Sequence, residues 1–141
     1  MTVHSRHAVA AAAAAVIFTA GVAAAQDAGV RPVASVRQIM EALVVPASDA
    51  VFNVADPPAD ATAWAGIERQ AAMLAEGGNL LMLGSRARDG EAWAESARAL
   101  VDSAAKAAAA AHDQNFDALI EASDAVYGTC VSCHATYLPK P

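Results

Sequence analysis

Near its end the chain reads Cys130-Val131-Ser132-Cys133-His134, and this stretch constrains the interpretation of everything upstream of it. On a helix the two cysteines lie at i and i+3, on one face, and the histidine follows beside them. The pattern C-x-x-C-H is typical of covalent haem attachment, in which two thiols bond the porphyrin and the histidine ligates the iron. We therefore expect one haem c, attached through Cys130 and Cys133, with His134 as the proximal iron ligand.

Three other kinds of site contain residues of this type. A thioredoxin-type redox motif normally opens a helix after a strand, whereas this stretch closes a chain without strand-like alternation. A zinc site needs four ligands, and His112 is the only other histidine after residue 25. A structural disulfide does not require an adjacent histidine. Covalent haem is therefore favoured, and a haem-free helical bundle with a Cys130–Cys133 disulfide stays open as the alternative from another class.

Residues 1–25 have the pattern of a secretory signal peptide. A short basic start precedes an apolar run over residues 8–22, and Ala23-Ala24-Ala25 fits the small-x-small rule for cleavage before Gln26. A membrane-spanning helix needs ~20 apolar residues, and no later run reaches that length. We expect a periplasmic protein whose residues 26–141 form one domain with no membrane span.

The charge balance narrows the class of partner. The whole chain has 9 Lys and Arg against 15 Asp and Glu, a net charge of −6. Removing residues 1–25 takes away one arginine and no acid, which leaves 8 against 15 and a net charge of −7. No basic patch exists, so nucleic acid is not an expected partner. An acidic surface suits redox partner proteins that have a positive docking face.

Alanine richness and the spacing of apolar residues predict an all-α protein. Ser35 is a good N-cap for the first helix, and Pro46 predicts a kink or break near Val44. Gly77-Gly78 is expected to stop the second helix, with a brief turn or buried loop over residues 79–84. Short links imply an antiparallel four-helix bundle whose C-terminal helix binds the haem. The expected helices span residues 35–54, 63–76, 90–112 and 116–137.

The ligand on the far side of the iron decides between two kinds of haem protein. A methionine there gives a closed, six-coordinate electron carrier, and an apolar residue gives an open site for a small gas. Met40 lies on the apolar stripe of the first helix and can face the last helix across the bundle. Core packing explains Met40 equally well, because methionine is a common filler. Met82, in the apolar loop, is the second candidate and Met73 the third.

The haem propionates call for a cation, since burying an unpaired carboxylate is costly. Arg37 sits one turn before Met40 and is the best-placed cation, with a solvated surface charge as the competing explanation. Tyr137 follows the motif and can pack on the porphyrin, although an ordinary core aromatic would have the same spacing. The remaining candidates for these two roles are Arg86, Arg88, Lys140 and Tyr127.

These features together resemble the cytochrome c′ and cytochrome c-556 group. The resemblance rests on the signal peptide, four helices, the C-x-x-C-H motif in the last helix, Tyr137 three residues after His134, and Arg37-Gln38-Ile39-Met40 in the first helix. It implies a haem inside the bundle near one end, with His134 as proximal ligand and the first helix supplying the distal residue. In the c-556 branch that residue is a ligating methionine, and in the c′ branch the iron is five-coordinate and binds nitric oxide.

The sequence thus predicts a periplasmic monohaem cytochrome that transfers one electron at a time. A five-coordinate protein that binds nitric oxide or carbon monoxide is the alternative. Catalysis is not expected, because no acid, base and nucleophile converge in the pattern. Bundles of this type often pair as homodimers, although no apolar stripe here requires a second copy.

Overall fold

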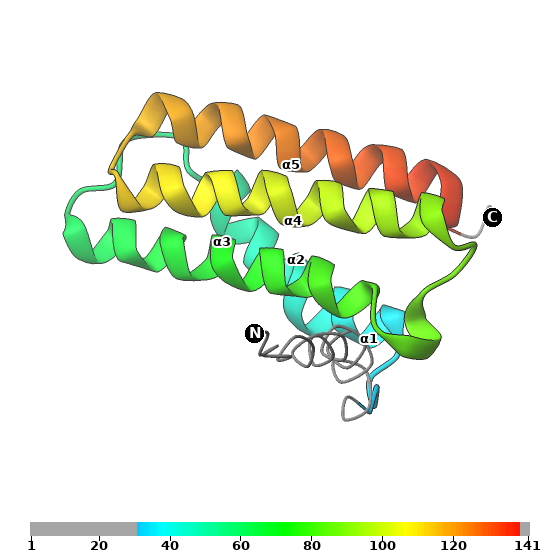
Figure 1. The fold of residues 1–141 in the computed structure, drawn as a ribbon. Coiled ribbons are helices and arrows are strands. Elements are labelled where there is room, and N and C mark those ends of the chain that lie inside the picture. The colour runs from blue at the N-terminus through cyan, green and yellow to red at the C-terminus, as the bar shows by residue number, and fades with distance from the viewer. Residues whose placement is uncertain (1–30, 139–141) are drawn as a thin grey trace, which may run out of the picture.

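The first quarter of the fold is a helical arm with an irregular centre. The computed structural model describes residues 31–138, and within them the arm comprises α1 (Val36–Ile39), the π-helix η1 (Met40–Val44) and α2 (Val45–Phe52). Three long helices follow, α3 (Ala61–Leu81), α4 (Glu91–His112) and α5 (Phe116–Tyr137), with a short 3₁₀ turn η2 (Gly84–Arg86) before α4. The arm and the three long helices pack antiparallel (Figure 1). The predicted all-α class and four-helix arrangement are confirmed.

The helices begin where short polar side chains can accept hydrogen bonds from the exposed amides of the first turn. Ser35 and Gln38 form a reciprocal capping box at the start of α1. Asp60 accepts from the amide of Ala63 at the start of α3, and Asn115 does the same for the amide of Ala118 in α5. The N-cap predicted at Ser35 is therefore confirmed. The last helix, expected to open after Asp113 or Asn115, opens after Asn115.

The irregularity predicted near Val44 takes the form of a π-helix. Pro46 has no amide hydrogen and its ring crowds the carbonyl four residues back, so a regular α-helix cannot pass through it unchanged. The chain widens by one residue instead, and the amide of Val45 donates to the carbonyl of Met40. Because such wide turns are frequent at functional sites, their occurrence beside Met40 draws attention to that residue.

The glycine pair does not end the second helix, which corrects the prediction. α3 continues to Leu81, and both Gly77 and Gly78 are buried inside it. A Cβ on Gly77 would lie 2.7 Å from Cγ2 of Val44, and a Cβ on Gly78 would lie 2.7 Å from Cγ2 of Val101. The two glycines therefore let α3 approach the helical arm and α4 closely. Residues 79–81, expected in a brief turn or a buried loop, form the last turn of the helix.

The interior contains two groups of buried side chains, one toward each end of the bundle. The motif-end cluster includes Ile39, Val44, Leu74, Leu81, Trp93, Ala97, Leu100 and Val126. The far-end cluster consists of Val51, Trp64, Ala71, Ala107, Ala110, Ala111, Leu119 and Ala122. All six stripe residues predicted on α4 are buried, namely Trp93, Ala97, Leu100, Ala104, Ala107 and Ala111. Among the described helices, none is long and apolar enough to span a membrane. The predicted signal peptide, residues 1–25, lies outside the described part of the chain.

Candidate functional site

The last two turns of α5 hold the cysteine motif at the end of the bundle where the chain enters α1. Cys130 and Cys133 are half-buried free thiols, one helical turn apart, and Cys130 packs against the motif-end cluster. His134 follows on the same turn and is exposed. The predicted placement of the motif within the C-terminal helix is therefore confirmed, with both thiols turned toward the interior rather than to solvent.

A cavity of about 310 Å³ opens directly beside the motif. Its size lies within the ~300–1,000 Å³ that cofactor pockets occupy. Met40 from η1 and Trp93 from α4 face it together with Cys130, Cys133 and His134 from α5. The rest of its wall is formed by Val44, Val45, Ser48, Asp49, Phe52, Leu81, Ser96, Ala97, Leu100, Tyr127 and Thr129. Residues 90 positions apart in sequence thus meet around one hollow.

A second hollow of about 510 Å³ adjoins the first. The two share Met40, Trp93, Cys133 and His134 as lining residues, so these four side chains stand at their boundary. The second hollow is the more polar one, since its wall includes Arg37, Glu41 and Arg88 as well as Val36, Tyr137 and Leu138. The site therefore has an apolar chamber next to a chamber with cations, which is the division that a porphyrin with two propionates requires.

The serine and threonine hydroxyl groups in the wall of the smaller cavity are already satisfied by their own helices. The hydroxyls of Ser48, Ser96 and Thr129 donate to the carbonyls of Val45, Ala92 and Ala125 at 2.9, 3.0 and 3.0 Å. No buried side-chain nitrogen or oxygen in residues 31–138 lacks a hydrogen-bond partner. The cavity therefore suits an apolar ligand surface, because covering these three hydroxyls leaves none of them without an acceptor.

Burial controls the state of both thiols. Desolvation raises the pKa of Cys130, and the neighbouring Cys133 raises it further. Desolvation also raises the pKa of Cys133, against a smaller lowering by the cation of Arg88. Both sulfurs are therefore protonated thiols at neutral pH. A redox C-x-x-C pair normally has a thiolate of lowered pKa at a helix N-terminus, and these cysteines lie near a helix C-terminus instead.

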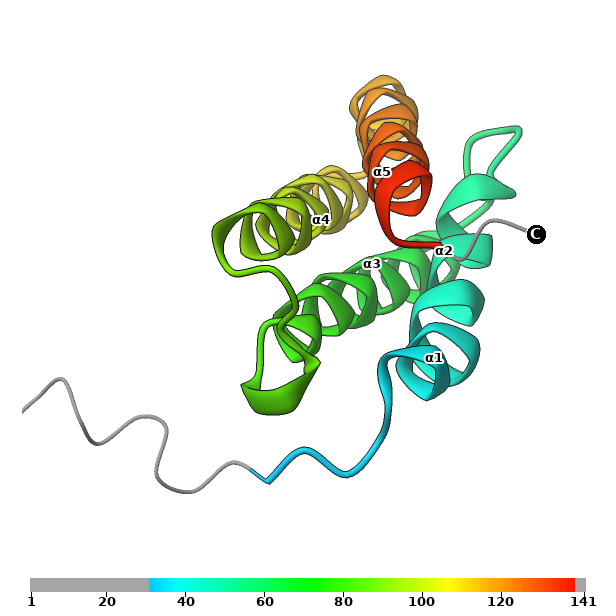
Figure 2. The same ribbon diagram turned by 90° about the vertical axis from the view of Figure 1, so that its right-hand side faces the viewer.

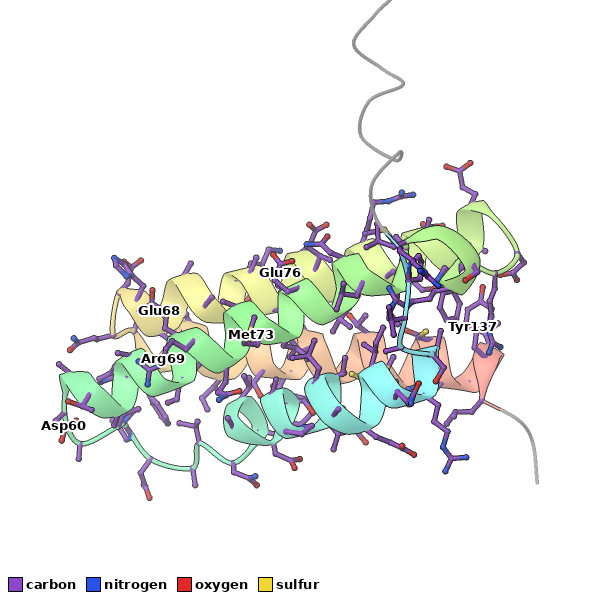
Figure 3. All side chains as sticks on the ribbon, turned by 90° about the horizontal axis from the view of Figure 1, so that it is seen from below. Asp60, Glu68, Arg69, Met73, Glu76 and Tyr137 are labelled. Atoms are coloured by element: carbon purple, nitrogen blue, oxygen red, sulfur yellow. The ribbon has the colours of Figure 1, made fainter. Side chains whose placement is uncertain are left out.

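Two aromatic side chains lock the end of α5 to the start of α4. The rings of Trp93 and Tyr137 meet edge to face with their centroids 4.8 Å apart. The indole Nε1 of Trp93 donates to the carbonyl of Leu81 at 2.8 Å, and the hydroxyl of Tyr137 donates to Oδ1 of Asp89 at 2.9 Å. Partial desolvation, followed by the bond to Asp89, raises the pKa of Tyr137. Tyr137, predicted to pack on a porphyrin, thus lies at the edge of the second hollow, one turn after His134 (Figure 3).

The structure separates the three methionine candidates. Met40 is half-buried and lines both hollows, together with the motif residues. Met82 caps the C-terminus of α3 and packs against the motif-end cluster without lining either hollow. Met73 is 42% exposed on the outer side of α3 (Figure 3). Met40 is thus the only one of the three that the fold brings to the motif.

The structure also distinguishes the candidate cations by their contacts. Arg37 lines the second hollow, but its Nε is 2.7 Å from Oε1 of Glu41 on an exposed face, and this bond raises the pKa of Arg37. Arg88 lines the same hollow, with its guanidinium 5.4 Å from the centre of the Trp93 ring. Arg86 is buried and instead donates to the carbonyls of Ala34 and Leu80, at 2.8 and 3.2 Å. Its role is structural, and Lys140 lies outside the described residues.

Two residues of the site did not stand out in the sequence. Trp93 was expected only as part of the apolar stripe of α4, yet it stands at the boundary of both hollows. Arg88 was ranked below Arg37, because its loop shows no helical period from which a direction can be inferred. The signal that could have raised its rank is the pair Arg88 and Trp93, since arginine often stacks on a nearby tryptophan.

Comparison of the chain with protein-family models, curated proteins and solved structures finds no match. The residues and their arrangement are therefore the only basis for the function that follows.

Proposed function

We propose that this chain is a c-type cytochrome of the four-helix-bundle kind that transfers single electrons in the periplasm. The observation that supports this most directly is the cavity shared by Cys130, Cys133, His134 and Met40. Two thiols, an imidazole and a thioether facing one apolar hollow are the side chains that attach and ligate a haem. The resemblance to the cytochrome c′ and cytochrome c-556 group points the same way.

Each side chain has a distinct task in this proposal. The thiols of Cys130 and Cys133 would hold the haem covalently. His134 would ligate its iron, and Met40 is the candidate for a second ligand. The haem, when bound, supplies a couple between ferrous and ferric iron. Leu81, Ala97 and Leu100 would give the porphyrin apolar walls, and Arg88 with Arg37 would offer positive charge to the propionates.

Covalent attachment is tested by expressing the full chain with a haem-maturation system and measuring haem by the pyridine haemochrome assay. The chain should retain haem after denaturation and acid extraction. Cys130→Ser with Cys133→Ser should release it, whereas Ser132→Ala, between the two cysteines, should retain it. Absence of covalent haem in the unaltered chain would overturn the proposal in favour of a haem-free bundle. The mass of the exported chain reports cleavage before Gln26.

The distal ligand is tested by spectra of the reduced protein with and without carbon monoxide. If Met40 ligates the iron, the spectrum is low-spin and unaffected by the gas, and Met40→Ala makes it high-spin and gas-sensitive. Met82→Ala and Met73→Ala are matched controls, since neither side chain lines the hollows. A high-spin, gas-binding spectrum in the unaltered chain would replace the electron carrier with the five-coordinate gas-binding alternative.

A further inference from the structure

The exposed apolar surface of the molecule is concentrated beside the cavity. Seven large hydrophobic side chains in the described residues are exposed, and five of them belong to α2, α5 or the residue that ends α5. These five are Val45, Phe52, Tyr127, Val131 and Leu138. Val45, Phe52 and Tyr127 also line the smaller cavity, so its wall reaches the surface between α2 and α5. Apolar surface gathered in this way marks a binding surface more often than scattered residues do.

The exposed apolar residues and two aspartates form two facing stripes. The stripe on α2 consists of Val45, Asp49 and Phe52, which share a helix face because they are spaced four and then three residues apart. Asp124, Tyr127 and Val131 do the same along α5. The rings of Phe52 and Tyr127 meet edge to face, 6.1 Å apart, and join the two stripes. Figure 2 shows α2 and α5 along one side of the bundle, with α3 and α4 along the other.

The same side of the molecule has acidic residues without any lysine or arginine. α2 contains one acid, Asp49, and no lysine or arginine. α5 contains three acids and again no lysine or arginine. Asp117, Glu121 and Asp124 are exposed and continue the Tyr127–Val131 stripe along α5 at steps of four and three. The other described segments contain all the described cations, namely Arg31, Arg37, Arg69, Arg86, Arg88, Arg98 and Lys106.

We propose that the face formed by α2 and α5 is the docking surface for a redox partner protein whose own face has an apolar centre ringed by lysine and arginine. This rests on the proposed function, since the surface lies over the cavity that would hold the haem. Charge complementarity selects this occupant: a second copy would set acids against acids, and an anionic membrane would be repelled. The apolar stripes supply the contact, and the carboxylates around them steer the approach.

The test uses a lysine-rich cytochrome c of the small soluble type as the probe. Its binding to this protein is followed by fluorescence anisotropy of the labelled probe at several ionic strengths. Glu121→Lys with Asp124→Lys alters the proposed face without touching a cavity-lining residue. Glu76→Lys with Glu95→Lys is the matched control, with the same change in net charge on α3 and α4 (Figure 3 shows Glu76 on the outer side of α3).

The affinity for the cytochrome c probe should fall on the order of tenfold or more in the α5 variant and no more than about twofold in the control. The reason is that charges inside an interface contribute more to binding than charges outside it. The salt dependence should also flatten in the α5 variant. Tyr127→Ser should weaken binding at all ionic strengths. Equal losses in the two double variants would overturn the proposal, since net charge alone would then explain them.

Two further outcomes would reassign the surface. Sedimentation that shows a dimer dissociated by Tyr127→Ser would assign it to a second copy of the chain, and binding to vesicles of anionic lipid would assign it to a membrane. Haem content is measured on the same samples. A preparation that binds the probe through this face but contains no haem would keep the docking surface and overturn the cytochrome proposal. A preparation that contains haem but loses equal affinity in the two double variants would keep the cytochrome proposal and overturn the docking surface.

Discussion

The two ends of this bundle are built from the same four helical segments but solve the packing problem in opposite ways. At the far end, five of the eight clustered residues are alanines, and Ala71, Ala107 and Leu119 are 0% exposed. At the motif end, bulky residues such as Trp93 and Leu100 surround a hollow rather than fill it. Small side chains let helices approach until no space is left, whereas large ones hold the helices apart.

The difference shows that a bundle can keep a cavity between two helices when its other helix pairs are closely packed. At the motif end, Gly77 and Gly78 bring α3 against the arm and against α4. Trp93 ties α4 to the end of α3 through its bond to Leu81. The remaining seam, between α2 and α5, is the one left open beside the cavity. One end of the molecule is therefore closely packed, and the other keeps an open cavity.

The largest expected effect compares a leucine from each end. Leu119→Ala removes a side chain that is 0% exposed at the filled end, and it should lower the free energy of unfolding by about 2–5 kcal/mol. Leu100→Ala should cost about 2 kcal/mol, near the bottom of that range, because Leu100 already borders a cavity and has fewer contacts to lose. Urea denaturation of both variants measures the two losses.

In the proposed cytochrome, the haem content of the same two variants sharpens the comparison. Leu100→Ala alters the wall of the cavity and should reduce haem content, whereas Leu119→Ala should leave it unchanged in the folded fraction. Equal losses of stability would mean that the hollow is filled or collapses in solution, and that the contrast between the ends is not energetic.

The second effect distinguishes a glycine that close helix packing requires from a glycine that has free space around it. Gly78→Ala places a methyl group 2.7 Å from Val101 and 3.0 Å from the carbonyl of Ala97, and should destabilise the fold by about 1–3 kcal/mol. Gly128→Ala, in α5, meets nothing within 4 Å and should stabilise it by up to about 1 kcal/mol, because alanine is the better helix former. Thermal denaturation distinguishes the signs. Stabilisation by Gly78→Ala would show that α3 and α4 have room to separate.

The helices were predictable because their signals are local. Ser35 and Asn115 sit next to the amides they cap, and the apolar period of α4 identified its buried face. The prediction that Gly77-Gly78 ends the second helix was wrong, because glycines can either end a helix or let another helix come close. Which of these occurs depends on Val44 and Val101, distant in sequence, and no local pattern records that pairing.

The site was predictable to the extent that it lies on regular helices. The period of the first and last helices placed Met40 opposite the motif, and the fold brings these residues to one cavity. The segment between α3 and α4 was not predictable. There the buried Arg86 is held by the carbonyls of Ala34 and Leu80, and these bonds depend on the tertiary fold.

The smallest expected effect compares the polar ties that close the two ends. At the far end, Nδ1 of His112 lies 3.2 Å from Oε1 of Glu68, in an exposed pair that is ionic only when the imidazole is protonated. A double-mutant cycle of His112→Ala and Glu68→Ala should give a coupling below about 1 kcal/mol that declines further at high salt. A larger, salt-independent coupling would contradict the assignment of a surface ion pair.

At the motif end the corresponding tie is the hydrogen bond from the uncharged phenol of Tyr137 to the carboxylate of Asp89, and it should respond to alkaline pH more than to salt. The pKa of Tyr137 is raised in the folded chain. The hydrogen bond therefore stabilises the fold fully below the ordinary tyrosine pKa of about 10, and this stabilisation is lost as pH rises through the higher pKa of the folded chain. The stability difference between the unaltered chain and Tyr137→Phe should therefore be constant from neutral pH to about 9 and shrink above that. Denaturation at each pH, repeated at low and high salt, measures it. Because this tie holds the last turn of α5, the turn after His134, its loss should also change the spectrum of the proposed haem, whereas loss of the His112–Glu68 pair should not.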